Sequence, residues 1–385
     1  MMRTTALSST SLRLARSLGA VALLAGLAGC ALWGPGKAKP ADLGPNVALL
    51  PVEKAWTAKI EPLKTLPLQV LVNGSAVTLA SADGSLQTLD ALTGAPLWQA
   101  RVGQPLTAAI GGDARHQAVV TQANEVVLLE QGREVWRKRL TAASYTPPLV
   151  AGGRVFVLSA DRALTAFDAD NGRQLWVQQR TGEPLVLRQV GVLTAVGDTL
   201  IAGLSGRMVA LNPDNGAVLW EAPLASPRGT NDVERLVDLV GPVSRDGDEL
   251  CARAFQASVA CVDTASARLK WVQPARGALG VGGDAQSVFG AESNGVVIAW
   301  RRADGSRLWS TDRLQHRKLT APLLLGRSVI VGDDDGLVHL LSKEDGSPLN
   351  RLTTDDSGIA AAPVVAADTL VVVTRRGGVY GFRPD

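Results

Sequence analysis

One phrase recurs along this chain at intervals of about forty residues: a turn containing Gly, an aliphatic residue and then Trp. It is clearest at residues 90–98, 168–176 and 212–220, where Gly stands four residues before the Trp. Weaker copies occur elsewhere, one Trp near the start has no turn before it, and in one copy Asn replaces Trp. We call the last residue of each copy its closing position; these are residues 56, 98, 136, 176, 220, 271, 309 and 350. These intervals match the blades of a β-propeller rather than the shorter helical and leucine-rich repeats.

A second signal stays in phase with the first. Turn-forming pairs stand fifteen and fourteen residues before the closing position, at Asp83-Gly84, Asp161-Arg162, Ser205-Gly206, Asn294-Gly295 and Asp335-Gly336. Asn-Gly and Asp-Gly accept the positive backbone angles of two-residue hairpin turns, and aliphatic runs flank them here. Each repeat is therefore expected to form a four-stranded antiparallel sheet.

The two ends of the chain complete one last repeat. Residues 360–382 supply three strands without a closing Trp, and residues 52–60 supply a single strand that contains Trp56. We therefore predict an all-β fold over residues 50–385: an eight-bladed β-propeller of four-stranded antiparallel blades, with the last blade closed by the N-terminal strand. Such closure leaves only short, protected edges. The Trp side chains are expected to pack between neighbouring blades.

The first 29 residues have the composition of a signal peptide. A basic start is followed by an apolar run over residues 17–30, which is too short to span a bilayer as a helix. Small residues lead up to Cys30. The chain is therefore expected to be exported, with residues 1–29 removed.

Cys30 points to a lipid anchor. The sequence LAGC at residues 27–30 resembles the lipobox of bacterial lipoproteins, which implies acyl chains on Cys30, and the following Ala31 implies release to the outer membrane. Several acyl chains hold a protein on a bilayer far more firmly than a single chain does. Residues 30–49 are expected to be a flexible tether. The alternative is an ordinary secreted protein whose signal peptide ends near a Cys.

Loss of the signal peptide also balances the charge. The whole chain carries 39 basic and 36 acidic residues, and residues 1–29 hold three Arg and no acid, which leaves 36 of each. No basic surplus remains to indicate nucleic-acid binding.

Cys251 and Cys261 fall on the two strands of one predicted hairpin, in a compartment that permits disulfides. A two-residue turn at Gln256-Ala257 would place their sulfurs on opposite faces of the sheet. A one-residue bulge would place them opposite each other instead. Whether they form a disulfide stays open at this stage.

Signals for catalysis or metal binding are weak. The three histidines, His116, His316 and His339, lie outside nucleophile and zinc motifs. The acidic cluster at residues 333–336 coincides with a predicted hairpin turn and lacks the spaced ligands of a calcium loop. The basic residues 313–318 are expected to form a solvated loop. We assign no catalytic residue, no metal site and no cofactor.

Taken together, these features resemble a known family. The Asp/Asn, Gly and Leu-Trp phrase is similar to the repeat of quinoprotein dehydrogenases, and a lipobox followed by eight such blades resembles the BamB family of outer-membrane lipoproteins over essentially the whole chain. The resemblance implies a non-enzymatic scaffold of the β-barrel assembly (BAM) complex. It would be lipid-anchored at the periplasmic side of the outer membrane, bind the POTRA domains of BamA and assist insertion of outer-membrane proteins. Its sheet edges or loops could hold nascent chains by strand addition.

Two connections between a Trp strand and the next inner strand are candidates for the BamA contact. Residues 183–191 and 231–242 occupy equivalent places in adjacent blades, and the second lies in the longest interval, where an insertion has been added. The family resemblance implicates Leu185, Leu187 and Arg188 in the first connection, and Arg235 and Asp238 in the second. Val240 departs from the family pattern, which often has a second acid there.

The alternative function is that of a periplasmic oxidoreductase dependent on pyrroloquinoline quinone. It rests on the shared repeat alone. The chain is shorter than such enzymes usually are, and it lacks the vicinal Cys pair found in many of them.

Overall fold

The computed structural model describes residues 38–64, 66–181 and 185–384. Within these ranges all 32 regular elements are strands, and no helix there is long and apolar enough to cross a membrane. Residues from Ala41 onward form one compact unit. The predicted signal peptide and Cys30 lie outside the described residues.

Seven sheets each contain four strands that are consecutive along the chain. Blades 1 to 4 consist of β2 (Leu71–Asn73), β3 (Ala76–Ala80), β4 (Ser85–Asp90) and β5 (Pro96–Arg101); β6 (Leu106–Gly112), β7 (His116–Thr121), β8 (Glu125–Glu130) and β9 (Arg133–Arg139); β10 (Leu149–Ala151), β11 (Arg154–Leu158), β12 (Ala163–Asp168) and β13 (Gln174–Gln179); and β14 (Leu193–Val196), β15 (Thr199–Leu204), β16 (Arg207–Leu211) and β17 (Val218–Pro223).

Blades 5 to 7 follow the same order. They consist of β18 (Leu239–Asp246), β19 (Glu249–Ala254), β20 (Ser258–Asp263) and β21 (Arg268–Pro274); β22 (Val281–Gly283), β23 (Ser287–Ala291), β24 (Val297–Arg301) and β25 (Arg307–Thr311); and β26 (Leu323–Leu325), β27 (Ser328–Gly332), β28 (Leu337–Ser342) and β29 (Pro348–Thr353).

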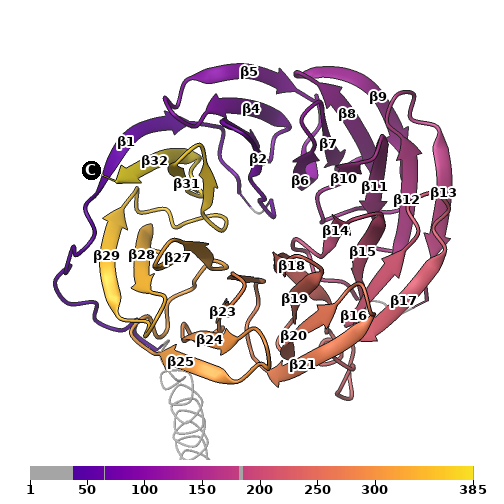
Figure 1. The fold of residues 1–385 in the computed structure, drawn as a ribbon. Coiled ribbons are helices and arrows are strands. Elements are labelled where there is room, and N and C mark those ends of the chain that lie inside the picture. The colour runs from indigo at the N-terminus through magenta and orange to yellow at the C-terminus, as the bar shows by residue number, and fades with distance from the viewer. Residues whose placement is uncertain (1–37, 65, 182–184, 385) are drawn as a thin grey trace, which may run out of the picture. The chain divides into compact units, whose positions relative to one another are not determined.

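Blade 8 joins the two ends of the chain. It contains β30 (Val364–Ala366), β31 (Thr369–Val373), β32 (Gly378–Pro384) and, as its outer strand, β1 (Val52–Lys59). β1 pairs antiparallel with β32, from Val52 opposite Pro384 to Lys59 opposite Gly378. Figure 1 shows indigo β1 beside yellow β32 in the ring of eight sheets. The predicted fold, including its closure by the N-terminal strand, is confirmed.

The ring of residues 41–384 has two ends, which we name by what they carry. The connection face carries the connections between blades, such as residues 312–322, and the hairpins between second and third strands, such as residues 160–162. The turn face carries the other hairpins, such as residues 326–327 and 343–347. Both names follow from the antiparallel strand order.

The predicted two-residue hairpin turns on the connection face were wrong at four of the five pairs. Only Ser205-Gly206 is such a turn, with Leu204 opposite Arg207 and positive φ at both central residues. The other four hairpins have three-residue loops, since Ala80 lies opposite Leu86, Leu158 opposite Leu164, Ala291 opposite Val297 and Gly332 opposite Val338. Only the last loop residue then needs a positive φ, as at Gly84 (φ 92°).

The hairpin of β19 and β20 also has a three-residue loop, at residues 255–257, although here the middle residue, Gln256, has the positive φ (54°). The extra loop residue shifts the pairing by one position, so that Cys251 lies directly opposite Cys261. The pairing expected from a two-residue turn was therefore wrong.

Neighbouring blades interlock through the Trp phrase. The Trp136 Nε1 donates a hydrogen bond of 2.8 Å to the Ala169 carbonyl, in the turn that opens the phrase of the next blade. A Cβ on Gly172 of that turn would lie 2.7 Å from the Trp136 ring. Equivalent hydrogen bonds run from Trp56 to Ala91, Trp176 to Pro213, Trp271 to Arg302 and Trp309 to Lys343. The Gly of most phrases thus leaves space for the Trp of the preceding blade, whereas blade 5 has Ala267 at the equivalent position, with a φ of 58°.

This interlock explains why Asn350 replaces Trp. The next blade is blade 8, whose outer two strands come from opposite ends of the chain, so no turn is present for an indole to contact. Instead the Asn350 Nδ2 donates 2.6 Å to the carbonyl of Leu50, which precedes β1.

Candidate partner-binding rim

Two neighbouring connections on the connection face form the candidate site. One links β13 to β14 and the other links β17 to β18. We call their described parts, residues 185–191 and 231–238, the rim loops. Glu183 and Pro184 of the first predicted segment lie outside the described residues.

Arg162, from the hairpin between β11 and β12, holds the two rim loops together. The Arg162 Nη1 lies 3.1 Å from Asp238 Oδ1, and its Nη2 donates 2.9 Å to the Leu185 carbonyl. The second carboxylate oxygen of Asp238 accepts the Leu187 N–H at 3.1 Å. The side chains of Arg162 and Asp238 are only 7% and 16% exposed. Because a partly buried ion pair is stable only when hydrogen bonds satisfy both partners, this arrangement defines the conformation of the first loop.

The backbones of the loop ends also pair. Gly191 forms a bridge with Val240, and the Gly241 N–H donates 3.0 Å to the Val190 carbonyl. Val240 is 1% exposed and lies opposite Arg253 on β19. The position where the family pattern often has an acid therefore faces the protein interior in this chain.

Three side chains of the first loop differ in how far they are exposed to a binding partner. Leu185 is 40% exposed. The Arg188 guanidinium is exposed and lies 5.7 Å from the centre of the Tyr145 ring, within cation–π range. Leu187 is half-buried and lines a cavity of about 50 Å³ together with Tyr145 and Asp238. The loop thus presents one apolar and one cationic group outward.

The second loop carries a single capped helical turn. The Asn231 Oδ1 accepts the Glu234 N–H at 3.0 Å, and the Glu234 carboxylate accepts the Thr230 N–H at 2.9 Å. Asn231 thus caps the turn, and the Glu234 carboxylate binds the residue just before this N-cap, a variant of the capping box. The hydrogen bond from Thr230 lowers the pKa of the Glu234 carboxyl. The turn exposes Arg235, together with Val233, which is 68% exposed.

Comparison with known proteins identifies the family. The sequence pattern of "Outer membrane protein assembly factor BamB" matches residues 82–311. The BamB of Burkholderia pseudomallei is 37% identical over 375 residues, which cover 97% of this chain and 98% of that protein. The BamB of Bordetella pertussis is 35% identical over 95% of this chain and 96% of its own length.

The chain belongs to the BamB family.

Solved structures agree on the fold. BamB from Moraxella catarrhalis matches with a TM-score of 0.79 and 22% identity, over 86% of this chain and 99% of that one. A quinohemoprotein alcohol dehydrogenase from Comamonas testosteroni matches with a TM-score of 0.67 and 12% identity, over 87% and 77%. The BamB fold is therefore shared with enzymes, and chemistry has to be judged from the residues of the site.

The central cavity of this BamB-family chain does not suit a quinone with its calcium ion. The cavity measures about 940 Å³ and is lined mainly by apolar residues of the inner strands and of the connections that lead into them. Among its described lining residues Glu292 is the one carboxylate. Its two oxygens are already bound to the Arg253 guanidinium, at 2.9 Å, and to the Arg276 N–H. Calcium requires six to eight oxygen ligands, so we derive no reaction through such a group.

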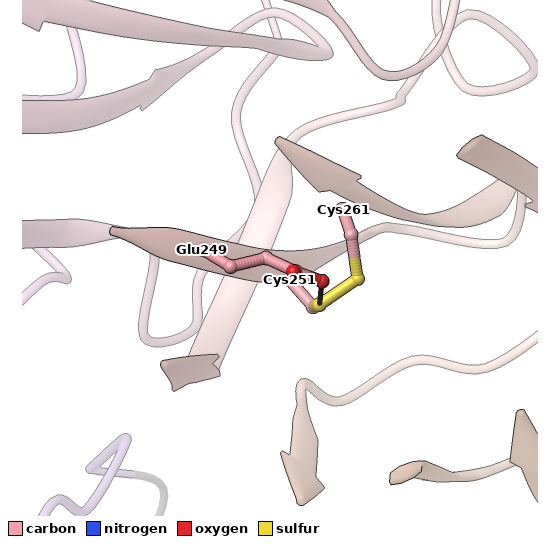
Figure 2. Close-up of side chains that lie close together, drawn as sticks. All are labelled: Glu249, Cys251 and Cys261. Carbon is pink, nitrogen blue, oxygen red and sulfur yellow. Dashed lines mark hydrogen bonds between the residues drawn. A yellow bond between two sulfur atoms is a disulfide. The ribbon is translucent and has the colours of Figure 1, made fainter. Parts of the chain in front are cut away.

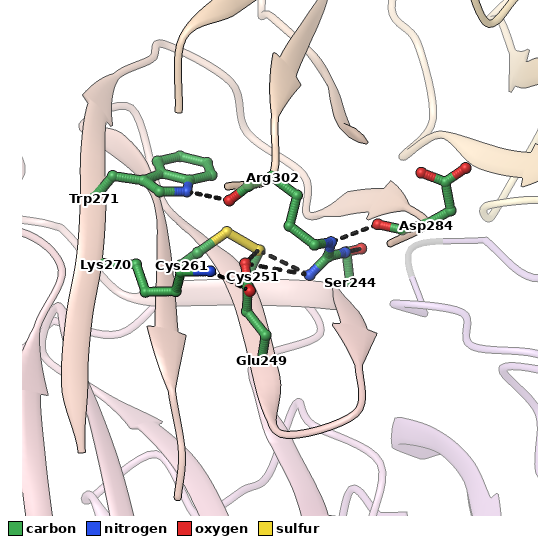
Figure 3. Close-up of a disulfide and its surroundings, with 8 residues drawn as sticks. All are labelled: Ser244, Glu249, Cys251, Cys261, Lys270, Trp271, Asp284 and Arg302. Atoms are coloured by element: carbon green, nitrogen blue, oxygen red, sulfur yellow. Dashed lines mark hydrogen bonds and ion pairs between the residues drawn. A yellow bond between two sulfur atoms is a disulfide. The ribbon is translucent and has the colours of Figure 1, made fainter. Parts of the chain in front are cut away.

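Cys251 and Cys261 form a disulfide, and both are fully buried. Within the described residues they form, with Glu249, the one group of potential metal ligands, drawn in Figure 2. A metal binds thiolates, which a disulfide does not offer. In Figure 3 the buried Arg302 guanidinium lies 3.2 Å from the Cys251 sulfur and also contacts Ser244. This arrangement is a structural link between blades 5 and 6.

The acidic cluster at residues 333–336 is likewise occupied by protein groups. The Asp333 Oδ2 lies 2.9 Å from both the Arg317 Nη1 and the His339 Nε2. Arg317 also pairs with Asp335 at 2.8 Å, and the Lys318 N–H donates to Asp334. Arg317 is buried, which corrects the expectation that residues 313–318 form a wholly solvated loop.

Arg162 was not among the site residues predicted from the sequence. The residue ends a three-residue hairpin loop, at the position that Gly84, Gly295, Gly336 and Gly377 occupy in four other blades, and its φ is 64°. A long cationic side chain at such a position was the available signal. Leu185, Arg188 and Arg235 are exposed as a partner contact requires, whereas the carboxylate of Asp238 faces Arg162.

Proposed function

We propose that this protein is a non-catalytic subunit of the outer-membrane β-barrel assembly machinery. Lipids on Cys30 hold it at the periplasmic side of the outer membrane, and the rim loops bind the POTRA domains of BamA. In this role it assists folding and insertion of outer-membrane proteins, and nascent chains are potential additional ligands.

One observation supports the BamA contact above the others. The rim loops are joined by the Arg162–Asp238 ion pair, while Leu185 and Arg188 point outward beside them. A surface whose backbone is already ordered loses little entropy when it binds. Arg and apolar anchors are also the side chains that carry most binding energy at protein interfaces.

Charge reversal at the rim tests this contact. We expect Arg188→Glu to lower recovery of BamA with the tagged full-length protein by about tenfold or more, the effect of losing a central interface residue. The matched control is Arg173→Glu, an exposed residue on the turn face of the same blade.

Unchanged recovery of BamA by a folded Arg188→Glu variant would remove the rim from the proposal. Equal losses in both variants would indicate a general effect of charge. The anchor is tested separately with Cys30→Ala, which should release the protein from the outer-membrane fraction without affecting its blades.

A further inference from the structure

The chain before β1 is docked on the outside of blade 7. Residues 41–51, which we call the strap, run along β29, and Figure 1 shows this indigo segment outside that strand. Part of the strap lies in residues 30–49, which the sequence analysis assigned to a flexible tether. The structure instead includes everything from Ala41 onward in the compact unit.

Hydrogen bonds hold the strap at several points along its length. On the connection face, the Ala41 N–H donates 2.9 Å to the Gln315 carbonyl, and Arg317 donates to the Ala41 carbonyl at 3.3 Å. Further along, the Arg351 Nη2 donates 2.9 Å to the Gly44 carbonyl.

The second half of the strap is held in the same way. The Asn46 side chain donates to Asn350 at 2.9 Å and to the Arg351 carbonyl at 3.1 Å. The Leu49 N–H donates 2.7 Å to the Leu349 carbonyl. Leu43 packs against one apolar core cluster and Leu50 against another.

The strap crosses the full height of the ring. Ala41 contacts the connection between β25 and β26, which lies on the connection face. Val52 lies opposite Pro384 at the far end of β32, on the turn face. Without the strap, the N-terminal segment would therefore leave the ring from the turn face. With the strap docked, it leaves from the connection face, which also carries the rim loops.

We propose that the strap sets the point at which the tether to the membrane anchor leaves the ring, at blade 7 on the connection face. This inference rests on the lipid anchor of the proposed function. Cys30 is eleven residues before Ala41, so the anchor reaches at most about 40 Å from a docked strap and about 80 Å from Val52 when the strap is released. Docking thus shortens the tether and brings the face that carries the rim loops toward the bilayer.

Energy transfer from the ring to the membrane tests the proposal. The lipidated full-length protein is bound to phosphatidylethanolamine and phosphatidylglycerol vesicles that contain a headgroup-labelled acceptor lipid. A donor dye is placed on Asp312→Cys, on the connection face, or on Arg327→Cys, on the turn face of the same blade. Both positions are exposed, and the native cysteines of the ring are buried in a disulfide.

We expect more transfer from position 312 than from position 327. Combining Leu43→Ser, Asn46→Ala and Arg351→Ala should release the strap, so that transfer from position 327 exceeds transfer from position 312. Faster amide exchange at Leu49 would confirm the release. As a control, a Gly-Ser insertion after Lys39 lengthens the tether but leaves the strap docked. It should weaken transfer at both positions and preserve their order.

Equal transfer from both positions in the parent would overturn the proposal, and so would a released strap that keeps the parent ratio. A parent that does not float with the vesicles would instead contradict the lipid anchor itself, which separates failure of the proposed function from failure of the strap.

Discussion

At the scale of single residues, Gly172 shows how one blade restricts the sequence of the next. Its φ is 68°, and the space beside its Cα is filled by the Trp136 ring. Asp168 starts the same turn, and its carboxylate accepts the Asp170 N–H at 2.9 Å. The side chain shapes the turn, the turn receives the Trp, and the Trp covers the gap between two sheets.

We predict that Gly172→Ala is more destabilising than Gly153→Ala. Both glycines have a positive φ, which costs an Ala roughly 1–2 kcal/mol, but Gly153 has no neighbouring atom within 4 Å of an added Cβ. The clash with Trp136 should add about 1–3 kcal/mol. Urea unfolding of the two variants measures the difference. If the clash is the cause, Gly172→Ala should add less destabilisation to a Trp136→Ala background than to the parent.

Asp333 makes stability depend on acid pH. Burial alone would raise the pKa of its carboxyl, but the hydrogen bond from His339 and the nearby Arg317 guanidinium hold that pKa below its usual value. A carboxyl with a lowered pKa in the folded state stabilises the protein above its unfolded-state pKa of about 4. That contribution is lost as the pH falls through the folded-state pKa.

We therefore predict that Asp333→Asn lowers the unfolding free energy at pH 7. The difference in unfolding free energy between this variant and the parent should become smaller below about pH 4. Denaturant unfolding between pH 2 and pH 7 measures both curves. A difference in unfolding free energy that stays constant across this pH range would contradict a lowered pKa of Asp333 in the folded state. Asp356→Asn serves as the control, since that carboxylate is exposed and pairs with an exposed Arg376.

At the scale of elements, the rim depends on contacts between blades. The Arg162 side chain comes from the hairpin of blade 3, whereas Asp238 stands just before the first strand of blade 5. The Leu187 N–H depends on that pair for its hydrogen bond. The first loop is therefore ordered by residues outside itself.

We predict that Asp238→Ala speeds amide exchange at Leu187 and weakens BamA binding indirectly, through disorder of the loop. Removing one partner of a buried ion pair costs about 3–5 kcal/mol, part of which should appear as local opening. Asp232→Ala, in the same connection but exposed, should change exchange at Leu187 little. Normal protection of Leu187 in Asp238→Ala would show that the ion pair does not order the loop.

At the scale of the whole molecule, the ring is held shut by its own N-terminal strand. β1 supplies the outer strand of blade 8 and places Trp56 against the first phrase of blade 1, where it donates 2.8 Å to the Ala91 carbonyl. Without β1, one edge of β32 would be unpaired and blade 1 would lose its contact with Trp56. Closure therefore removes an edge that would otherwise be available for aggregation.

We predict that a chain starting at Ile60 does not fold to a stable monomer, whereas a chain starting at Ala41 unfolds cooperatively at the parent temperature. A chain starting at Val52 lacks only the strap and should be intermediate. Calorimetry and light scattering distinguish the three. Parent-like unfolding of the chain that starts at Ile60 would contradict closure by β1.

Much of this protein follows from periodicity. The spacing of the Trp phrase and the distribution of strands at the two ends specify eight blades and their closure, because each repeat forms its own local sheet. The hairpin registers were less accessible. A pair such as Asp83-Gly84 is compatible with loops of two or three residues, and only the paired strands distinguish them. For that reason the sequence did not show whether Cys251 and Cys261 form a disulfide.

The sequence by itself determined the number and order of the blades and the location of the insertion, since these depend on patterns within about forty residues. Only the tertiary structure decided that Arg162 binds Asp238, 76 residues away, and that the strap lies against blade 7, about 300 residues along the chain. Such contacts form between elements that are remote in sequence, and no local pattern encodes them. They arise once the blades pack and the ring closes, and the proposed rim and anchor point both depend on them.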